Sequence, residues 1–63
     1  MADDRLIPLP DVLRLTGIRK DHLYKLMRRG EFPIQAKVGR ASRWSLAEVS
    51  AWTQARLSER RAA

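Results

Sequence analysis

The stretch LTGIRKDHLYKLMRRGEFP, residues 15–33, decides the fold. Leu23, Leu26 and Met27 recur at the i, i+3, i+4 spacing of one helix face, which predicts a helix over residues 20–29. A glycine precedes this helix and another follows it, and glycine commonly closes a helix in the left-handed conformation. Together these features predict a helix-turn-helix, for which a plain helical hairpin is the alternative.

The first helix of that motif is predicted to start at Leu9-Pro10-Asp11. Proline suits the first turn of a helix, and the aspartate complements the positive end of the helix dipole. Thr16-Gly17 would end the helix, and Ile18 would fold back onto the core. Its apolar side would consist of Val12, Leu13 and Leu15.

A short β-hairpin is predicted after the second helix. Ile34, Ala36 and Val38 alternate with polar residues, which is the period of a strand. Gly39-Arg40-Ala41 would form the turn and residues 42–44 the returning strand. In that arrangement Ile34, Val38 and Trp44 face the core, whereas Lys37 and Arg43 share the solvent face with Arg40 at the tip. Such a hairpin after a helix-turn-helix is a wing.

A third helix is predicted from the capping box Ser45-Leu46-Ala47-Glu48, in which the serine hydroxyl accepts from the Glu48 amide and the glutamate reaches back. Its apolar arc, which would pack over the first two helices, consists of Leu46, Val49, Trp52 and Leu57. We therefore expect one domain over residues 1–63, mainly α with a two-stranded wing, ordered over about 6–57 and frayed at both ends.

Positive charge is concentrated in the middle of the chain. The 13 Lys and Arg exceed the 7 Asp and Glu, for a net charge of +6. Residues 19–43 hold eight cations against two acids, whereas the flanking segments carry net charges of −1 and +1. A localised positive field indicates a polyanionic partner, most commonly nucleic acid. A surface made basic for solubility is the weaker alternative, because solubility does not require clustering.

These charges predict how the domain meets duplex DNA. The N-terminal part of the second helix would enter the major groove, and the wing would contact phosphates or a narrow minor groove. The candidate residues are Lys20, Asp21, Tyr24 and Lys25 near bases or flanking phosphates, Arg19, Arg28 and Arg29 as backbone anchors, and Lys37, Arg40 and Arg43 on the wing. Tyr24 is equally interpretable as a peripheral core residue, and a capping or salt-bridge role is favoured for Asp21.

Other functional classes find little support in the sequence. There is no cysteine, and His22 is the only histidine, so we expect no metal site, no cofactor and no catalytic nucleophile–base set. We expect His22 on the surface and both tryptophans, Trp44 and Trp52, in the core rather than stacked on bases. No apolar run approaches the roughly 18 residues of a membrane span, and the acidic start is unlike a secretory signal. A cytoplasmic protein that is not an enzyme is therefore expected.

Over residues 6–57 the chain resembles the AlpA family of small prophage and mobile-element regulators, which are grouped with excisionases among MerR-like winged-helix proteins. The resemblance is carried by LTGI, LYKLMRRGEFP, the basic wing and RWSLAEVSAW, in that order. It implies that the second helix lies in the major groove and that the hairpin acts as a wing. One departure is Arg19, which stands where the family usually has a small hydroxyl residue as helix N-cap.

The expected function is sequence-specific binding of double-stranded DNA that activates or represses a prophage promoter. The same surface would serve an excisionase that bends DNA for an integrase, so both uses remain open. The protein would act by occupying DNA, by bending it, or by contacting RNA polymerase or an integrase. A phage packaging or assembly module that binds protein is a further alternative, and RNA binding is weaker because few aromatic residues are available for stacking. We expect a monomer or a cooperative assembly on repeated sites.

Overall fold

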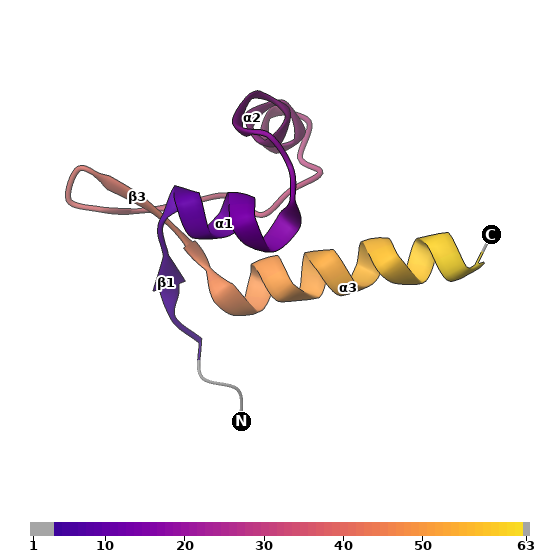
Figure 1. The fold of residues 1–63 in the computed structure, drawn as a ribbon. Helices are drawn as coiled ribbons and strands as arrows, with labels where there is room; N and C mark the ends of the chain where they lie inside the picture. Colours follow the sequence, from indigo (N-terminus) through magenta and orange to yellow (C-terminus); the bar gives the residue numbers. More distant parts are fainter. Residues whose placement is uncertain (1–3, 63) are drawn as a thin grey trace.

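A computed structural model describes residues 4–62, which form three helices and a small antiparallel sheet (Figure 1). The elements are β1 (Leu6–Ile7), α1 (Leu9–Thr16), α2 (Lys20–Arg28), β2 (Ala36–Val38), β3 (Ala41–Ser45) and α3 (Leu46–Ala62). The predicted winged helix-turn-helix is confirmed, with β2 and β3 as the wing. Expected fraying falls partly on residues 1–3 and 63, outside the described range, but α3 continues to Ala62, past the expected limit at residue 57.

The core is built by one or more apolar side chains from each helix and from the sheet. Trp44 of β3, Val12 of α1, Leu23 of α2 and Val49 of α3 are fully buried. They are joined by Ile7, Leu26, Met27 and Phe32. The stripe predicted for the second helix is thus confirmed, and so are the inward positions of Val12 and Trp44.

Two core positions predicted on the helices are wrong. Leu15 is 51% exposed and Leu57 is 38% exposed. Leu15 borders an open hollow beside α3, where no side chain covers it. Leu57 lies on the half of α3 that projects beyond the other helices in Figure 1. Their spacing suited a buried face, but no other element covers either side chain closely enough to bury it.

The end of α2 fixes the path of the chain into the wing. Gly30 adopts a left-handed conformation with φ of 73°. Its N–H donates to the Met27 carbonyl, and the N–H of Glu31 donates to the Leu26 carbonyl. This is the Schellman pattern of a helix C-terminus, and it directs Phe32 into the core at 4% exposure, as predicted.

The sheet has the strand order β1-β3-β2, with both pairs antiparallel. The β1 strand was not predicted, because two residues give no periodicity to read. The turn between β2 and β3 is also one residue shorter than predicted, because Val38 pairs directly with Ala41. Gly39 takes φ of 63°, the positive value that a type II′ turn requires at its first central residue.

This shorter turn reverses the predicted faces of the wing. Directly paired residues share a face, so Lys37 lies with Ser42 on the Trp44 face, whereas Arg43 lies with Ala36 on the opposite one. The prediction that Lys37 and Arg43 share a face is therefore wrong. The predicted burial of Ile34 and Val38 is also wrong, since they are 64% and 53% exposed. A shift of one residue in pairing changes the face of every side chain in a strand.

The start of α3 is capped from two directions. The Ser45 hydroxyl accepts from the Glu48 N–H at 3.1 Å, which confirms that half of the capping box. The bond from the Ser45 N–H to the Glu48 carboxylate is not among the side-chain hydrogen bonds of the described residues. Instead the Asp4 carboxylate accepts from the Ala47 N–H at 3.0 Å and from the Ser45 hydroxyl. These hydrogen bonds, the one from Ala47 first, lower the pKa of Asp4 below its ordinary value of 3.8.

The Asp4 cap predicts a pH-dependent contribution to stability. A carboxyl whose pKa is lower in the folded protein stabilises it fully above about pH 4, and this contribution is lost as the pH falls through the folded pKa. Asp4→Asn should therefore lower the melting temperature at pH 7, and the difference from the parent protein should shrink as the pH falls below the ordinary carboxyl pKa of 3.8. Glu59→Gln, which removes an equal charge far from this cap, is the control. A difference that is constant with pH would contradict a contribution from the ionised carboxylate.

Candidate nucleic-acid interface

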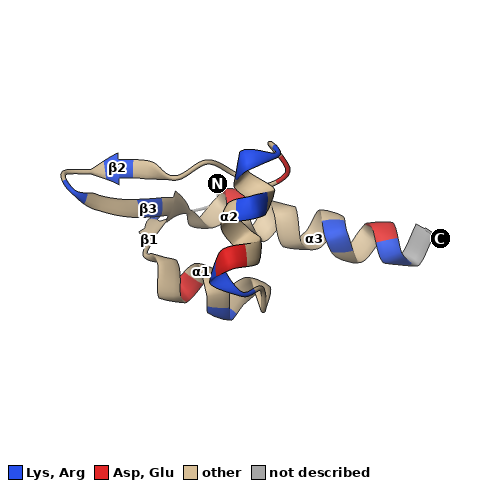
Figure 2. Cartoon of the chain, turned by 90° about the horizontal axis from the view of Figure 1, so that it is seen from above, with Lys and Arg blue, Asp and Glu red and all other residues tan. Residues whose placement is uncertain are grey.

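The outward face of α2 carries the charged side chains of the candidate site. Asp21, Lys25 and Arg28 lie opposite the buried stripe and are exposed. Lys20 and Arg29, near the two ends of the helix, are exposed as well. In Figure 2, which looks onto α2 from above, basic segments mark this helix and the neighbouring hairpin. The basic middle segment of the sequence therefore forms α2 and the neighbouring hairpin.

Most of these cations have no acidic partner. Within residues 4–62, ion pairs join Arg14 to Asp11, Arg56 to Glu59 at 3.6 Å, and Arg19 to Asp21 at 3.8 Å. The candidate cations that take part in none of these pairs are Lys20, Lys25, Arg28, Arg29, Lys37, Arg40 and Arg43. Their charge is consequently available to an external anion without the loss of an internal salt bridge.

The N-terminus of α2 is less basic than the sequence alone suggested. Arg19 occupies the N-cap position in an extended conformation and makes no side-chain capping hydrogen bond, as expected for this residue type. Its guanidinium instead lies near the Asp21 carboxylate, although both side chains are largely exposed. This contact is the salt-bridge role that the sequence favoured for Asp21.

Tyr24 connects the candidate recognition helix to the wing. Its ring meets the Trp44 indole edge-on, with the centroids 6.5 Å apart and the planes at 74°. Since Trp44 is fully buried in β3, this contact holds one side of α2 against the base of the hairpin. The half-buried ring agrees with the interpretation of Tyr24 as a peripheral core residue.

The three wing cations take different positions. Arg40 is exposed in the turn at the tip. Lys37 lies on the Trp44 face, and its ammonium donates to the Ser42 hydroxyl at 3.0 Å. Arg43 lies on the other face, and its guanidinium donates to the Ser42 carbonyl at 2.9 Å. The structure thus places Lys37 and Arg43 on opposite faces of the wing, with Arg40 at its tip.

Ser42 is a residue that the sequence analysis did not single out. It supports Lys37 from the opposite strand, and only the strand register reveals that the two residues are neighbours. With the predicted three-residue turn, Ser42 would pair with Val38 instead. No sequence signal distinguished these two registers.

A metal-binding arrangement is not found in the described part of the chain. No group of three or more His, Cys, Asp or Glu residues within it could hold a metal ion. His22 is exposed, as predicted. Among the described helices, none has the length and apolarity needed to cross a membrane. The main chemical feature of this surface is therefore its positive charge.

Comparison with known proteins agrees with this geometry. The family model described as prophage CP4-57 regulatory protein (AlpA) matches residues 5–57. The chain is also 34% identical over 62 residues to an uncharacterized protein, ORF88, of Enterobacteria phage P4, covering 97% of this chain and 70% of that protein. No solved structure matches the chain significantly. Because the family model matches most of the chain, and because the phage P4 relative is similar over nearly the whole of this chain, the chain belongs to the AlpA family of prophage regulatory proteins.

Proposed function

We propose that this regulatory protein binds double-stranded DNA in a sequence-specific manner, with α2 in the major groove and the wing on the adjacent minor groove or backbone. The observation that carries this proposal is the cluster of cations on α2 and the wing that no carboxylate compensates. An α-helix with its side chains is about 10–12 Å across, which fits a major groove about 12 Å wide, and α2 presents its charged side outward.

Each candidate residue has a role in this arrangement. The positions nearest the bases would be those on the N-terminal and central part of the outward face, and the flanking cations would contact phosphates. We assign Lys20, Tyr24 and Lys25 to bases or flanking phosphates, Arg28 and Arg29 to the backbone, Lys37 and Arg40 to the minor groove or its phosphates, and Arg43 to a phosphate beside the wing. Arg19 is assigned to the backbone as well, and Asp21, which pairs with Arg19, could contact only a base.

Selection from a random duplex library tests the proposal directly. Sequence-specific binding should enrich one motif, and four to six phosphate contacts should give a log–log salt dependence with a slope of about −4 to −5. Matched single-stranded RNA should bind more weakly than the selected duplex. An unenriched library, or duplex binding that does not depend on salt, would instead support the alternative of a protein-binding module.

The regulatory output would follow from occupancy of the DNA. Activation, repression and excision all use the same surface, through contact with RNA polymerase or through bending for an integrase. A bending assay with the selected motif placed at different positions along the DNA separates these outputs, because an excisionase must bend its site and a simple repressor need not.

Arg40→Ala tests the contribution of the wing tip. The variant should weaken binding to target and non-target duplexes by the same factor, because a phosphate contact carries no sequence information. It should also flatten the salt slope by about one unit. Arg60→Ala, on the projecting part of α3, removes the same charge and should change neither quantity. If the two variants behaved alike, Arg40 would not be a specific phosphate contact.

A further inference from the structure

The face of the wing that points away from Trp44 is apolar and uncovered. The strand register places Leu6 of β1 and both Ala36 and Val38 of β2 on this face. Leu6 and Val38 are 51% and 53% exposed, although they belong to the residue types that are most often buried. In Figure 1 the hairpin extends beyond the helices, so no element of the described chain shields this face.

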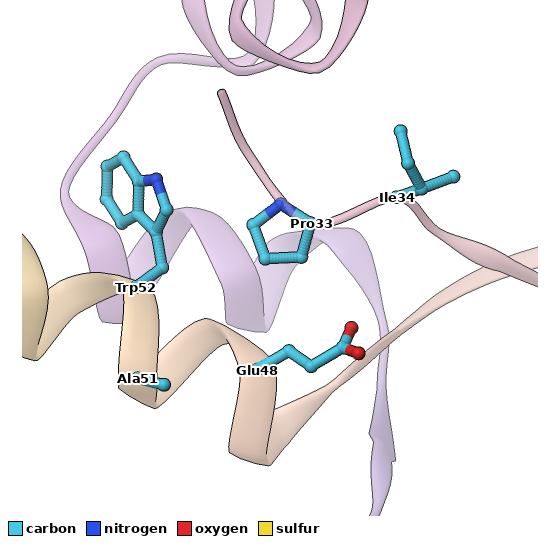
Figure 3. A pocket seen from close by; sticks show the side chains of 5 residues that line it. All are labelled: Pro33, Ile34, Glu48, Ala51 and Trp52. Atoms are coloured by element: carbon cyan, nitrogen blue, oxygen red, sulfur yellow. The ribbon is translucent and has the colours of Figure 1, made fainter. Parts of the chain in front are cut away.

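This face continues into a groove at the base of the wing. The groove has a volume of about 660 Å³ and is lined by Pro33 and Ile34 and, from α3, by Glu48, Ala51 and Trp52. Ile34 is 64% exposed and precedes β2, so it joins the groove to the apolar strip. Figure 3 shows the Glu48 carboxylate directed to the side on which Ile34 lies.

Two opposite charges flank the apolar strip. Arg43 shares its face with Ala36, and Glu48 borders the groove. Within the described residues neither of them forms an ion pair. We name the whole surface the outer wing face, and it consists of Leu6, Ile34, Ala36, Val38, Arg43 and Glu48.

We propose that two copies of this chain pair through their outer wing faces when both are bound to DNA. A two-fold contact places the same patch of both copies together, so each residue must find its complement within that patch. The outer wing face meets this condition, because it combines an apolar strip with one unpaired cation and one unpaired acid. Arg43 of each copy would lie against Glu48 of the other.

The size and charge of the surface explain why pairing depends on DNA. A stable interface buries about 800 Å² per partner, more than a six-residue patch supplies. Each copy also carries a net charge of +6, so two free copies repel each other. Phosphates remove that repulsion and hold the copies side by side. This inference rests on the proposed DNA binding and adds the arrangement of two copies.

The arrangement has a consequence for the DNA site. Wings that meet back to back place the two α2 helices on the outer sides of a two-fold axis. Recognition helices in successive major grooves on one side of the duplex lie about one turn, or about 10 base pairs, apart. The site selected by the pair should therefore be an inverted repeat with that spacing, not a direct repeat.

Binding to single and double half-sites tests the pairing. We expect the second copy to bind an inverted repeat about tenfold more tightly than an isolated half-site, a factor within the usual range of coupling between sites. Insertion of five base pairs should abolish the gain, because it rotates one half-site by about half a turn. Selection of a lone half-site or a direct repeat would overturn the proposal.

The double variant Leu6→Thr/Val38→Thr removes the apolar contact while keeping residues that suit a strand. It should lose the tenfold gain and keep the half-site affinity, since neither residue belongs to the proposed DNA contacts. Retention of the gain would refute pairing through this face. Absence of binding to any duplex by the parent protein would instead refute the DNA-binding function itself.

A charge exchange tests the pair across the two-fold axis. Arg43→Glu and Glu48→Arg should each reduce the gain on the inverted repeat, because each places like charges together. The variant with both changes should recover it. The gain of each variant is compared with the half-site affinity of the same variant. A loss of DNA affinity that is common to single and double sites therefore does not affect the comparison. Failure of the combined variant to recover the gain would rule out the Arg43–Glu48 contact.

Discussion

Trp44→Ala should remove a large part of the stability of the domain. Trp44 is fully buried, and the core residues of all three helices surround it. Truncation of such a residue costs about 3–5 kcal/mol. A 63-residue domain has a total stability of about 3–9 kcal/mol. The loss should be visible as reduced helical circular dichroism and a lower denaturant midpoint.

Trp44→Phe and Leu57→Ala provide the matched controls. The indole N–H of Trp44 is buried and has no hydrogen-bond partner in the described structure, so phenylalanine removes an unsatisfied donor while it keeps much of the ring. The phenylalanine variant should therefore lose less stability than the alanine variant. Leu57→Ala, at an exposed position in α3, should change stability by only about 0.5 kcal/mol. Equal losses at positions 44 and 57 would contradict the assignment of Trp44 to the centre of the core.

Lys25→Ala should have the largest effect on sequence discrimination. Lys25 lies at the centre of the outward face of α2, and no acid within the described chain competes for its ammonium. A specific contact to a base contributes about 1–3 kcal/mol, so affinity for the selected motif should fall by about 5- to 150-fold. Binding to unrelated duplexes should change much less, and the ratio of the two affinities should decrease.

Arg28→Ala is the matched comparison on the same helix face. As a backbone anchor, Arg28 should contribute equally to target and non-target duplexes, so its loss should leave the ratio unchanged. Alanine suits both positions, because it is the residue with the highest helix propensity and both side chains are exposed. A Lys25 variant that lost affinity for both duplexes equally would show that Lys25 contacts phosphate.

The helices could be predicted from the sequence because their signals are local. The spacing of Leu23, Leu26 and Met27 identified the buried side of α2, and a glycine marked the end of both α1 and α2. The Ser45 cap identified the start of α3 for the same reason. Hydrogen bonds and periodicity within one helix depend on residues a few positions apart, and these are visible in a single chain.

The sheet was predicted only in part. The turn at Gly39 and both hairpin strands were found, but β1 was missed and the register of the wing was shifted by one residue. The cap of α3 by Ser45 was predicted, but the additional cap by Asp4, which accepts from the Ala47 N–H, was not. These features join segments that are distant in sequence, so no local pattern determines them.

The candidate site divides in the same way. The sequence by itself determined where the positive charge lies along the chain and which residues of α2 point outward, because helix geometry fixes the direction of each side chain. Tertiary structure alone decided which face of the wing each cation occupies. The physical reason is that the direction of a strand side chain depends on pairing register, and pairing is settled only when two strands meet over a shared core.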